Sequence, residues 1–87
     1  MNTTELKFIK YGDIVYNVIN KGTTGIQKYQ YIGIHTDMEG IKKHLFISQY
    51  FLSTTTIEVG KEETSRNLKQ LHFKELDAIK YKKSLAD

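Results

Sequence analysis

The sequence predicts a mainly β fold, in which four to five short antiparallel strands form a small β-barrel and one α-helix follows at the C-terminus. Alternating β-branched and aromatic residues over 14–19 and 26–35 are typical of strands. Glycine-bearing segments separate the apolar runs, as in hairpins, whereas residues 61–87 contain neither glycine nor proline. The 87 residues suffice for one small core, so we expect a single domain over residues 1–87. An open α+β sheet is the alternative architecture.

The first two predicted strands follow from the same alternation. Both faces of segment 14–19 are largely apolar, which is typical of a strand packed within a barrel. Residues 20–25 are a turn-rich connection to the second strand, 26–35. Gly33 lies within that strand, where glycine favours a bulge or a sharp bend of the sheet. Residues 36–40 form a second tight connection.

Two further strands are predicted in the middle of the chain. Segment 41–52 is apolar in its centre and is expected to form a third strand that breaks near residues 48–50. Residues 54–59 are strongly β-branched and end at Gly60, so they predict a fourth strand. Residues 61–67 are polar, and we expect them to form a mobile loop.

The C-terminal residues 61–87 allow two interpretations: one long helix, or a short strand over 69–73 followed by a helix over 74–85. The placement of acidic residues early and lysines late suits the dipole of a helix. Phe73 and Tyr81 fall outside the apolar arc of a single helix, which favours the strand and helix. The resulting order of elements predicts a barrel of the SH3-like kind.

Two motifs of the chain resemble those of small proteins of phages and other mobile elements. They are Tyr11-Gly12-Asp13-Ile14-Val15-Tyr16 and Leu71-His72-Phe73-Lys74-Glu75-Leu76-Asp77. In the proteins that the chain resembles, the first motif starts a barrel strand and the second leads into the last helix. The second motif here lacks the Ser or Thr that usually caps this helix. The resemblance implies an SH3-like barrel more than it implies an activity.

The composition excludes several classes of protein. Without cysteine the chain has no disulfide framework and no thiolate ligand or nucleophile, which favours a reducing compartment. Residues 1–7 lack the apolar centre of a signal peptide, and no apolar run approaches the roughly 18–20 residues that span a bilayer. We therefore expect a cytoplasmic protein that is not inserted in a membrane. The net charge of +3 includes only one arginine, which favours contacts with phosphate over the reading of bases.

No motif predicts catalysis, a metal site or a cofactor. The acidic residues lie at predicted turns or on polar faces, and no nucleophile motif or phosphate-binding glycine loop occurs. His35, Asp37 and Glu39 alternate along the chain and would place three metal ligands on one side of an extended segment. Because this segment is a predicted turn, we expect a solvated hairpin tip instead. We therefore predict a protein without catalytic residues, metal ligands or cofactors.

One candidate site is a surface for single-stranded nucleic acid. Tyr29 and Tyr31 share one face of the second strand with Lys28 beside them, an arrangement that offers stacked rings and a cation to bases and phosphates. Lysines of the C-terminal helix would add phosphate contacts, namely Lys80, Lys82 and Lys83. The alternatives are that the tyrosines pack against Phe46 or the terminal helix, and that the lysines form a solvated helix end.

The second candidate site is a surface for a protein partner. Tyr50, Phe51 and Leu52 are three large apolar residues in a row, which cannot all face one small core. An exposed member of this run would be covered by a partner or by a second copy of the chain in a homodimer. We therefore predict a non-enzymatic protein-interaction module, an accessory or inhibitory factor of mobile-element origin, that binds through this run and an exposed strand edge. The alternative is a small nucleic-acid-binding barrel with weak sequence selectivity.

Overall fold

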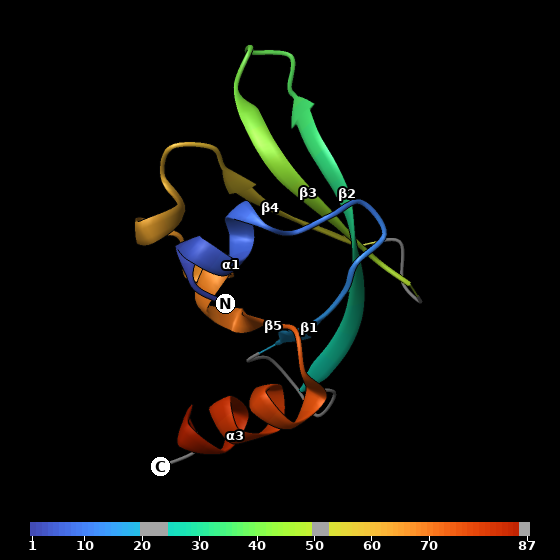
Figure 1. Cartoon of the computed structure of the whole chain (residues 1–87), viewed down its shortest axis with the longest axis vertical. Coiled ribbons are helices and arrows are strands. Elements are labelled where there is room, and N and C mark those ends of the chain that lie inside the picture. The colour runs from blue at the N-terminus through green and yellow to red at the C-terminus, as the bar shows by residue number, and fades with distance from the viewer. Residues whose placement is uncertain (20–24, 50–52, 86–87) are drawn as a thin grey trace.

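The computed structural model describes residues 1–19, 25–49 and 53–85. The described part of the chain contains α1 (Thr3–Lys7), β1 (Ile14–Val18), β2 (Ile26–Thr36), β3 (Lys42–Ser48), β4 (Thr54–Glu58), the 3₁₀ helix η1 (Glu62–Thr64), α2 (Arg66–Gln70), β5 (Leu71–His72) and α3 (Glu75–Leu85). The strands pair antiparallel in the order β4-β3-β2-β1-β5 and form a curled half-barrel (Figure 1). The predicted mainly β fold with a C-terminal helix is confirmed.

The sheet bends at the glycine that the sequence singled out. The register between β2 and β3 shifts between Tyr31 and Gly33, and the φ of Gly33 is +109°. This left-handed backbone region favours glycine because a side chain would be strained there. The β2–β3 hairpin continues beyond the bend and projects from the rest of the molecule (Figure 1). The predicted bulge is therefore present, and it helps the strands to curl.

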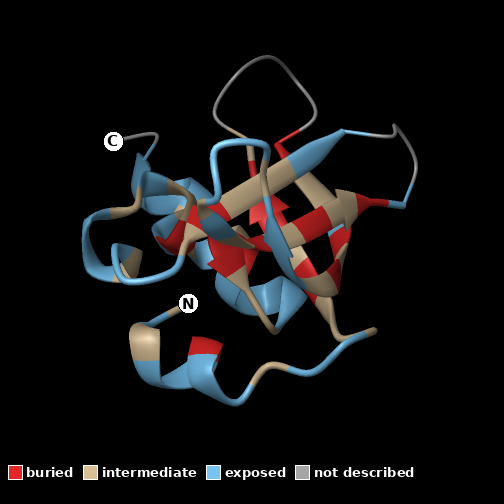
Figure 2. Cartoon of the chain, turned by 90° about the horizontal axis from the view of Figure 1, so that it is seen from above, coloured by how far each residue is buried: buried red, intermediate tan, exposed pale blue. Residues whose placement is uncertain are grey.

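The concave face of the half-barrel holds the core. Its buried residues come from α1, all five strands and α2, and they form one cluster: Leu6, Val15, Tyr29, Tyr31, Phe46, Ile57, Leu68 and Leu71. Figure 2 shows most buried positions gathered on the strands in the middle of the molecule, while the helices carry mostly exposed residues. Removal of this apolar surface from water is the main force that holds the curled sheet together.

The short helix α2 covers the gap between the two edge strands. It contacts β4 at one edge of the sheet and β5 and β1 at the other, and its Leu68 is buried in the core. The Asn67 side-chain amide donates a hydrogen bond of 2.7 Å to the Thr56 carbonyl of β4. This bond occupies a backbone group that an added strand would need. The strand edge that was expected to receive a partner is therefore partly covered.

Helix α3 packs on the opposite face of the sheet, at its β1 and β5 end. Side chains alternate along β1, so Val15 faces the core and Val18 faces the outer side of the sheet. Val18 is nevertheless buried. Ala78 of α3 is fully buried, and the ring of Tyr81 lies 5.1 Å from that of His72. The predicted helix over residues 74–85 is confirmed, and it shields one end of the outer face.

The segment before α3 differs from the prediction. The loop expected over residues 61–67 contains η1 and the start of α2, and the strand expected over 69–73 is reduced to Leu71–His72. The reason is that Leu68 and Leu71 both reach the core, which a helical turn followed by two extended residues allows. The single long helix over residues 61–87 is not formed.

Candidate functional site

The predicted platform for stacking bases is not on the surface. The side chains of Tyr29 and Tyr31 are only 4% and 6% exposed and belong to the core. The Tyr31 ring lies 5.1 Å from that of Phe46, and the Tyr29 hydroxyl lies 3.0 Å from the Ser53 hydroxyl. Base stacking needs an open ring face. The stacking prediction is therefore wrong, and packing against Phe46 is confirmed for Tyr31.

The lysines of that prediction are exposed but do not surround the tyrosines. Lys28 alternates with Tyr29 along β2 and so lies on the outer face of the sheet. Lys82 and Lys83 of α3 line a shallow apolar pocket together with Ile79 and Ile26, which lies two residues from Lys28 on the same face.

A third lysine of α3, Lys80, lines another pocket, together with His72 and Asp77. The structure thus brings Lys82 and Lys83 to one pocket, places Lys28 on the same face of the sheet, and places Lys80 at a second pocket. The predicted protein-contact residues Tyr50, Phe51 and Leu52 lie outside the described residues.

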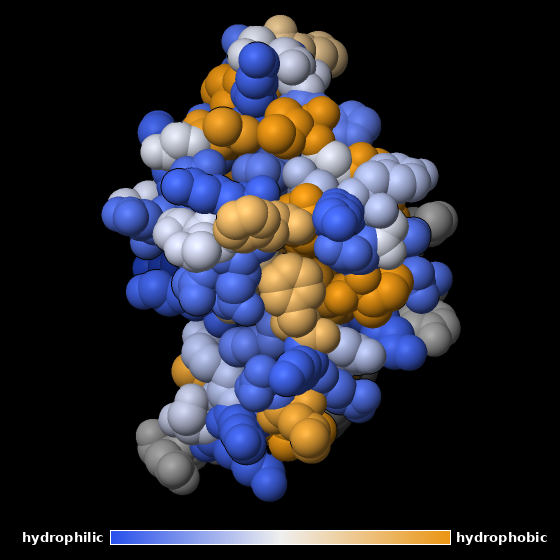
Figure 3. All heavy atoms as spheres, in the orientation of Figure 1, coloured by the Kyte–Doolittle hydropathy of each residue, from blue (hydrophilic) through white to orange (hydrophobic). Residues whose placement is uncertain are grey.

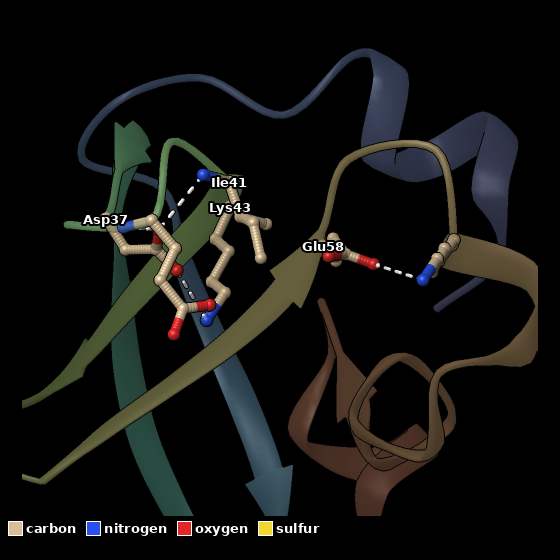
Figure 4. A network of polar contacts seen from close by, with 6 residues as sticks. Asp37, Ile41, Lys43 and Glu58 are labelled. Atoms are coloured by element: carbon tan, nitrogen blue, oxygen red, sulfur yellow. Dashed lines mark hydrogen bonds and ion pairs between the residues drawn. The ribbon is translucent and has the colours of Figure 1, made fainter.

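The hairpin tip that would have supplied metal ligands is built around Asp37. One carboxylate oxygen of Asp37 accepts hydrogen bonds of 2.9 Å from the backbone N–H groups of Glu39 and Ile41, and the other lies 3.2 Å from Lys43 Nζ (Figure 4). The Ile41 N–H bond is the main cause that lowers the pKa of Asp37, and Lys43 adds to it. The carboxylate thus stabilises the turn. Within the described ranges, no three His, Cys, Asp or Glu side chains are grouped so that they could hold a metal ion.

A pocket of about 280 Å³ opens where α1 lies over the inner face of the sheet. Its lining residues come from α1, the following segment, β2, β3 and η1: Thr3, Leu6, Lys7, Ile9, Tyr31, Ile34, His44 and Glu62. Leu6 is buried at the base, whereas Ile34 is 53% exposed. Phe8 lies in the chain between two of the lining residues and is 76% exposed. The pocket therefore has apolar walls and an apolar, solvent-facing edge.

The pocket has one polar end, formed by Tyr31, His44 and Glu62. The Tyr31 hydroxyl lies 2.8 Å from His44 Nδ1, and His44 Nε2 lies 3.9 Å from Glu62 Oε1. The carboxylate next to Nε2 favours the neutral tautomer with its proton there, so that the Tyr31 hydroxyl donates to Nδ1. A separation of 3.9 Å is too long for a hydrogen bond. A polar group of a ligand would therefore find incompletely paired atoms at this end.

Burial and hydrogen bonds set the protonation states of these three groups. Burial raises the pKa of Tyr31, and burial lowers the pKa of His44 although the Glu62 carboxylate opposes that shift. The backbone N–H groups of Gly60 and of Glu62 itself lower the pKa of Glu62. Near neutral pH the site therefore holds a protonated tyrosine, a neutral histidine and a fixed carboxylate. A ligand at this end of the pocket would therefore meet one negative charge, at Glu62.

A second pocket, of about 370 Å³, continues the first along α1. The two share Thr3, Lys7 and Glu62. The second is otherwise lined by Gly60 and Lys61, which join β4 to η1, and by Glu63 and Thr64 of η1 itself. We call the two together the α1 groove. It is apolar at the end formed by Leu6, Ile9 and Ile34 and polar along η1. Figure 3 shows hydrophobic and hydrophilic atoms interleaved on the face of the molecule that carries α1.

The sequence contains a signal for this groove that our prediction did not use. Asn2 accepts a hydrogen bond of 2.7 Å from the Glu5 backbone N–H, and the Glu5 side chain accepts one of 2.9 Å from the Asn2 backbone. This reciprocal pair is a capping box, and its spacing of three residues is visible in the sequence. The capping box predicts the helix α1. Leu6, the apolar residue that follows Glu5, predicts the face of this helix that packs on the core.

The stability of the domain is expected to fall as the pH drops from 7.5 to 5.5. Burial lowers the pKa of both His44 and His72 in the folded state, so the unfolded chain binds more protons in this range. The histidines thus contribute stability above their ordinary pKa of about 6.5, and this contribution is lost as the pH falls. Urea unfolding at several pH values measures the effect. The free energy of unfolding should depend less steeply on pH in His44→Gln, but not in the exposed control His35→Gln. A free energy of unfolding that rises toward pH 5.5 would contradict the prediction.

Comparison of the chain with protein-family models, with curated proteins and with solved structures finds no match. Of the helices in the described part of the chain, none is both long enough and apolar enough to cross a membrane. The functional assignment therefore depends on the geometry of the α1 groove and on the placement of Lys28, Lys82 and Lys83.

Proposed function

We propose that the chain is a non-enzymatic protein-interaction module and that the α1 groove is its binding surface. The observation that carries the proposal is the apolar pocket under α1, bordered by Ile34 at 53% exposure. Exposed apolar side chains next to a preformed hollow resemble the centres of protein interfaces, where one anchoring side chain supplies much of the affinity.

Two further features of the chain support this proposal. Phe8 is 76% exposed and Met38, at the tip of the β2–β3 hairpin, is fully exposed, so apolar contacts for a partner extend beyond the pocket. The run Tyr50-Phe51-Leu52 is an additional candidate contact for a protein partner or a second copy. The resemblance of the two sequence motifs to phage and mobile-element proteins supports an accessory or inhibitory role in the cytoplasm of a host cell.

Capture of a partner from a lysate of the host tests the proposal. We expect the tagged chain to retain a discrete protein after nuclease treatment and Ile34→Asp to reduce its retention at least about tenfold, because a charge would enter an apolar contact. Leu76→Asp adds the same charge at a residue of α3 that is 70% exposed, and it should retain the partner. Urea unfolding establishes that both variants are folded. Equal retention by the folded Ile34→Asp variant would remove the groove from the proposal.

A second candidate function is binding of a nucleic-acid backbone through Lys28, Lys82 and Lys83. Residues 65–87 contain six bases and three acids, whereas residues 1–64 contain seven of each, so the entire net charge of +3 belongs to the C-terminal part. Lys28, Lys82 and Lys83 lie on the face that α3 covers, which suits phosphate contacts of low sequence selectivity. In the capture experiment, retention of nucleic acid alone, lost with nuclease, would favour this function over the first.

A further inference from the structure

We infer that the α1 groove receives a basic side chain of the partner, arginine above all, with its aliphatic stem along the apolar wall and its charged head at Glu62. This inference rests on the proposed function and adds the chemistry of the partner to it. The wall consists of Leu6, Ile9 and Ile34, and the carboxylate stands at the end of the same pocket. Long basic side chains combine an apolar stem with a charged end, and this pocket has the matching order of surfaces.

The Glu62 carboxylate is held ready for a cation. Its Oε1 accepts a hydrogen bond of 2.9 Å from the Gly60 backbone N–H, which ties the side chain to the turn between β4 and η1. The side chain is 24% exposed, so it is partly shielded from solvent yet open to the pocket. His44, the ring that faces Glu62 at 3.9 Å, is too far away to satisfy the carboxylate by a hydrogen bond. A guanidinium fork fits a planar carboxylate and gains from such partial shielding.

Lys7 is the charge that competes with an incoming cation. It lines both pockets of the groove, and its charge contributes to the lowered pKa of Glu62. In the described part of the chain no ion pair joins Lys7 to Glu62, and Lys61 is paired with Glu58 at 3.2 Å. Lys7 therefore weakens the attraction for a basic side chain without filling its place. Removal of Lys7 should strengthen the binding of a cation and weaken that of an anion.

Titration of the whole chain with n-butylguanidinium, followed by amide ¹H–¹⁵N NMR, tests this inference. We expect saturable shifts at Leu6, Ile9, Ile34 and Glu62, an affinity reduced about three- to tenfold in Glu62→Gln, and an affinity increased about two- to fivefold in Lys7→Ala. Gln keeps the acceptor for Gly60, so the variant retains the local fold. The matched control Glu75→Gln removes the same charge from an exposed residue of α3, outside the groove, and should change the affinity less than twofold.

Three results would overturn the inference: shifts that do not saturate or that scatter over the surface, equal effects of Glu62→Gln and Glu75→Gln, or equally tight binding of n-butylsulfonate at the same residues. The test is separate from that of the proposed function. If capture of the partner depends on Ile34 while butylguanidinium does not bind, the groove binds a protein through other chemistry. If butylguanidinium binds as expected while no protein is captured, the pocket chemistry holds and the proposed function fails.

Discussion

Replacement of Tyr31 by Ala is expected to lower the free energy of unfolding by about 3–5 kcal/mol, the range for loss of a buried aromatic side chain. Tyr31 is 6% exposed, its ring contacts Phe46, and its hydroxyl is bonded to His44. The substitution would leave a cavity at the centre of the sheet and an unpaired nitrogen on His44. Urea denaturation monitored by circular dichroism measures the loss, and a domain of this size is expected to be largely unfolded by it.

The variant Tyr31→Phe separates packing from hydrogen bonding at this position. It keeps the ring and removes only the hydroxyl, so the expected loss is about 1–2 kcal/mol. This variant should stay folded and should bind nucleic acid as the wild type does. If Tyr31→Ala instead remained as stable as the wild type and lost affinity for single-stranded nucleic acid, the ring would be a stacking surface and the packing that we describe would be wrong.

Replacement of Ala78 by Asp is expected to cost about 3–5 kcal/mol, because it places an unpaired carboxylate in a fully buried contact. Ala78 lies where α3 packs on β1, so the substitution either unfolds the domain or releases α3 from the sheet. Release of α3 would separate Lys82 and Lys83 from Lys28, and any affinity for nucleic acid that depends on the three lysines together would fall. Urea unfolding and amide hydrogen exchange of β1 and β5 measure the two effects.

The matched control is Leu76→Asp, which introduces the same charge two residues earlier in α3. Leu76 is 70% exposed and lies in the first turn, where a negative charge suits the helix dipole. Its effect on stability should stay within about 0.5 kcal/mol. Equal losses in the two variants would show that α3 is sensitive to added charge in general and that burial of Ala78 is not the cause.

The strands could be predicted because their signals are local. Alternation of apolar and polar residues shows within each segment, and Gly33 marks the bend because few other residues accept a φ of +109°. The helical part was harder, because the break between α2 and α3 arises from the positions that Leu68 and Leu71 take in a core built by distant strands. The charge pattern of residues 61–87 agrees equally well with one long helix and with the observed series of η1, α2, β5 and α3.

The candidate site shows the same limit. Tyr29 and Tyr31 share a face by alternation alone, but which face of β2 becomes the interior depends on how the other strands pair with it. The α1 groove joins residues from both halves of the chain, such as Lys7 and Glu62, which no spacing in the sequence connects. Its one local signal was the capping box at Asn2 and Glu5.

The sequence by itself determined the first four β-strands, the bend at Gly33, the terminal helix and the absence of thiol chemistry, since each depends on residue type and on neighbours a few positions away. The tertiary structure decided that the tyrosines are core residues, that Lys82 and Lys83 meet Ile26 of β2 at one pocket, and that Glu62 stands at the end of an apolar pocket. The physical reason is that burial is a property of the whole chain. A strand has two faces, and only the packing of the other elements makes one of them the interior.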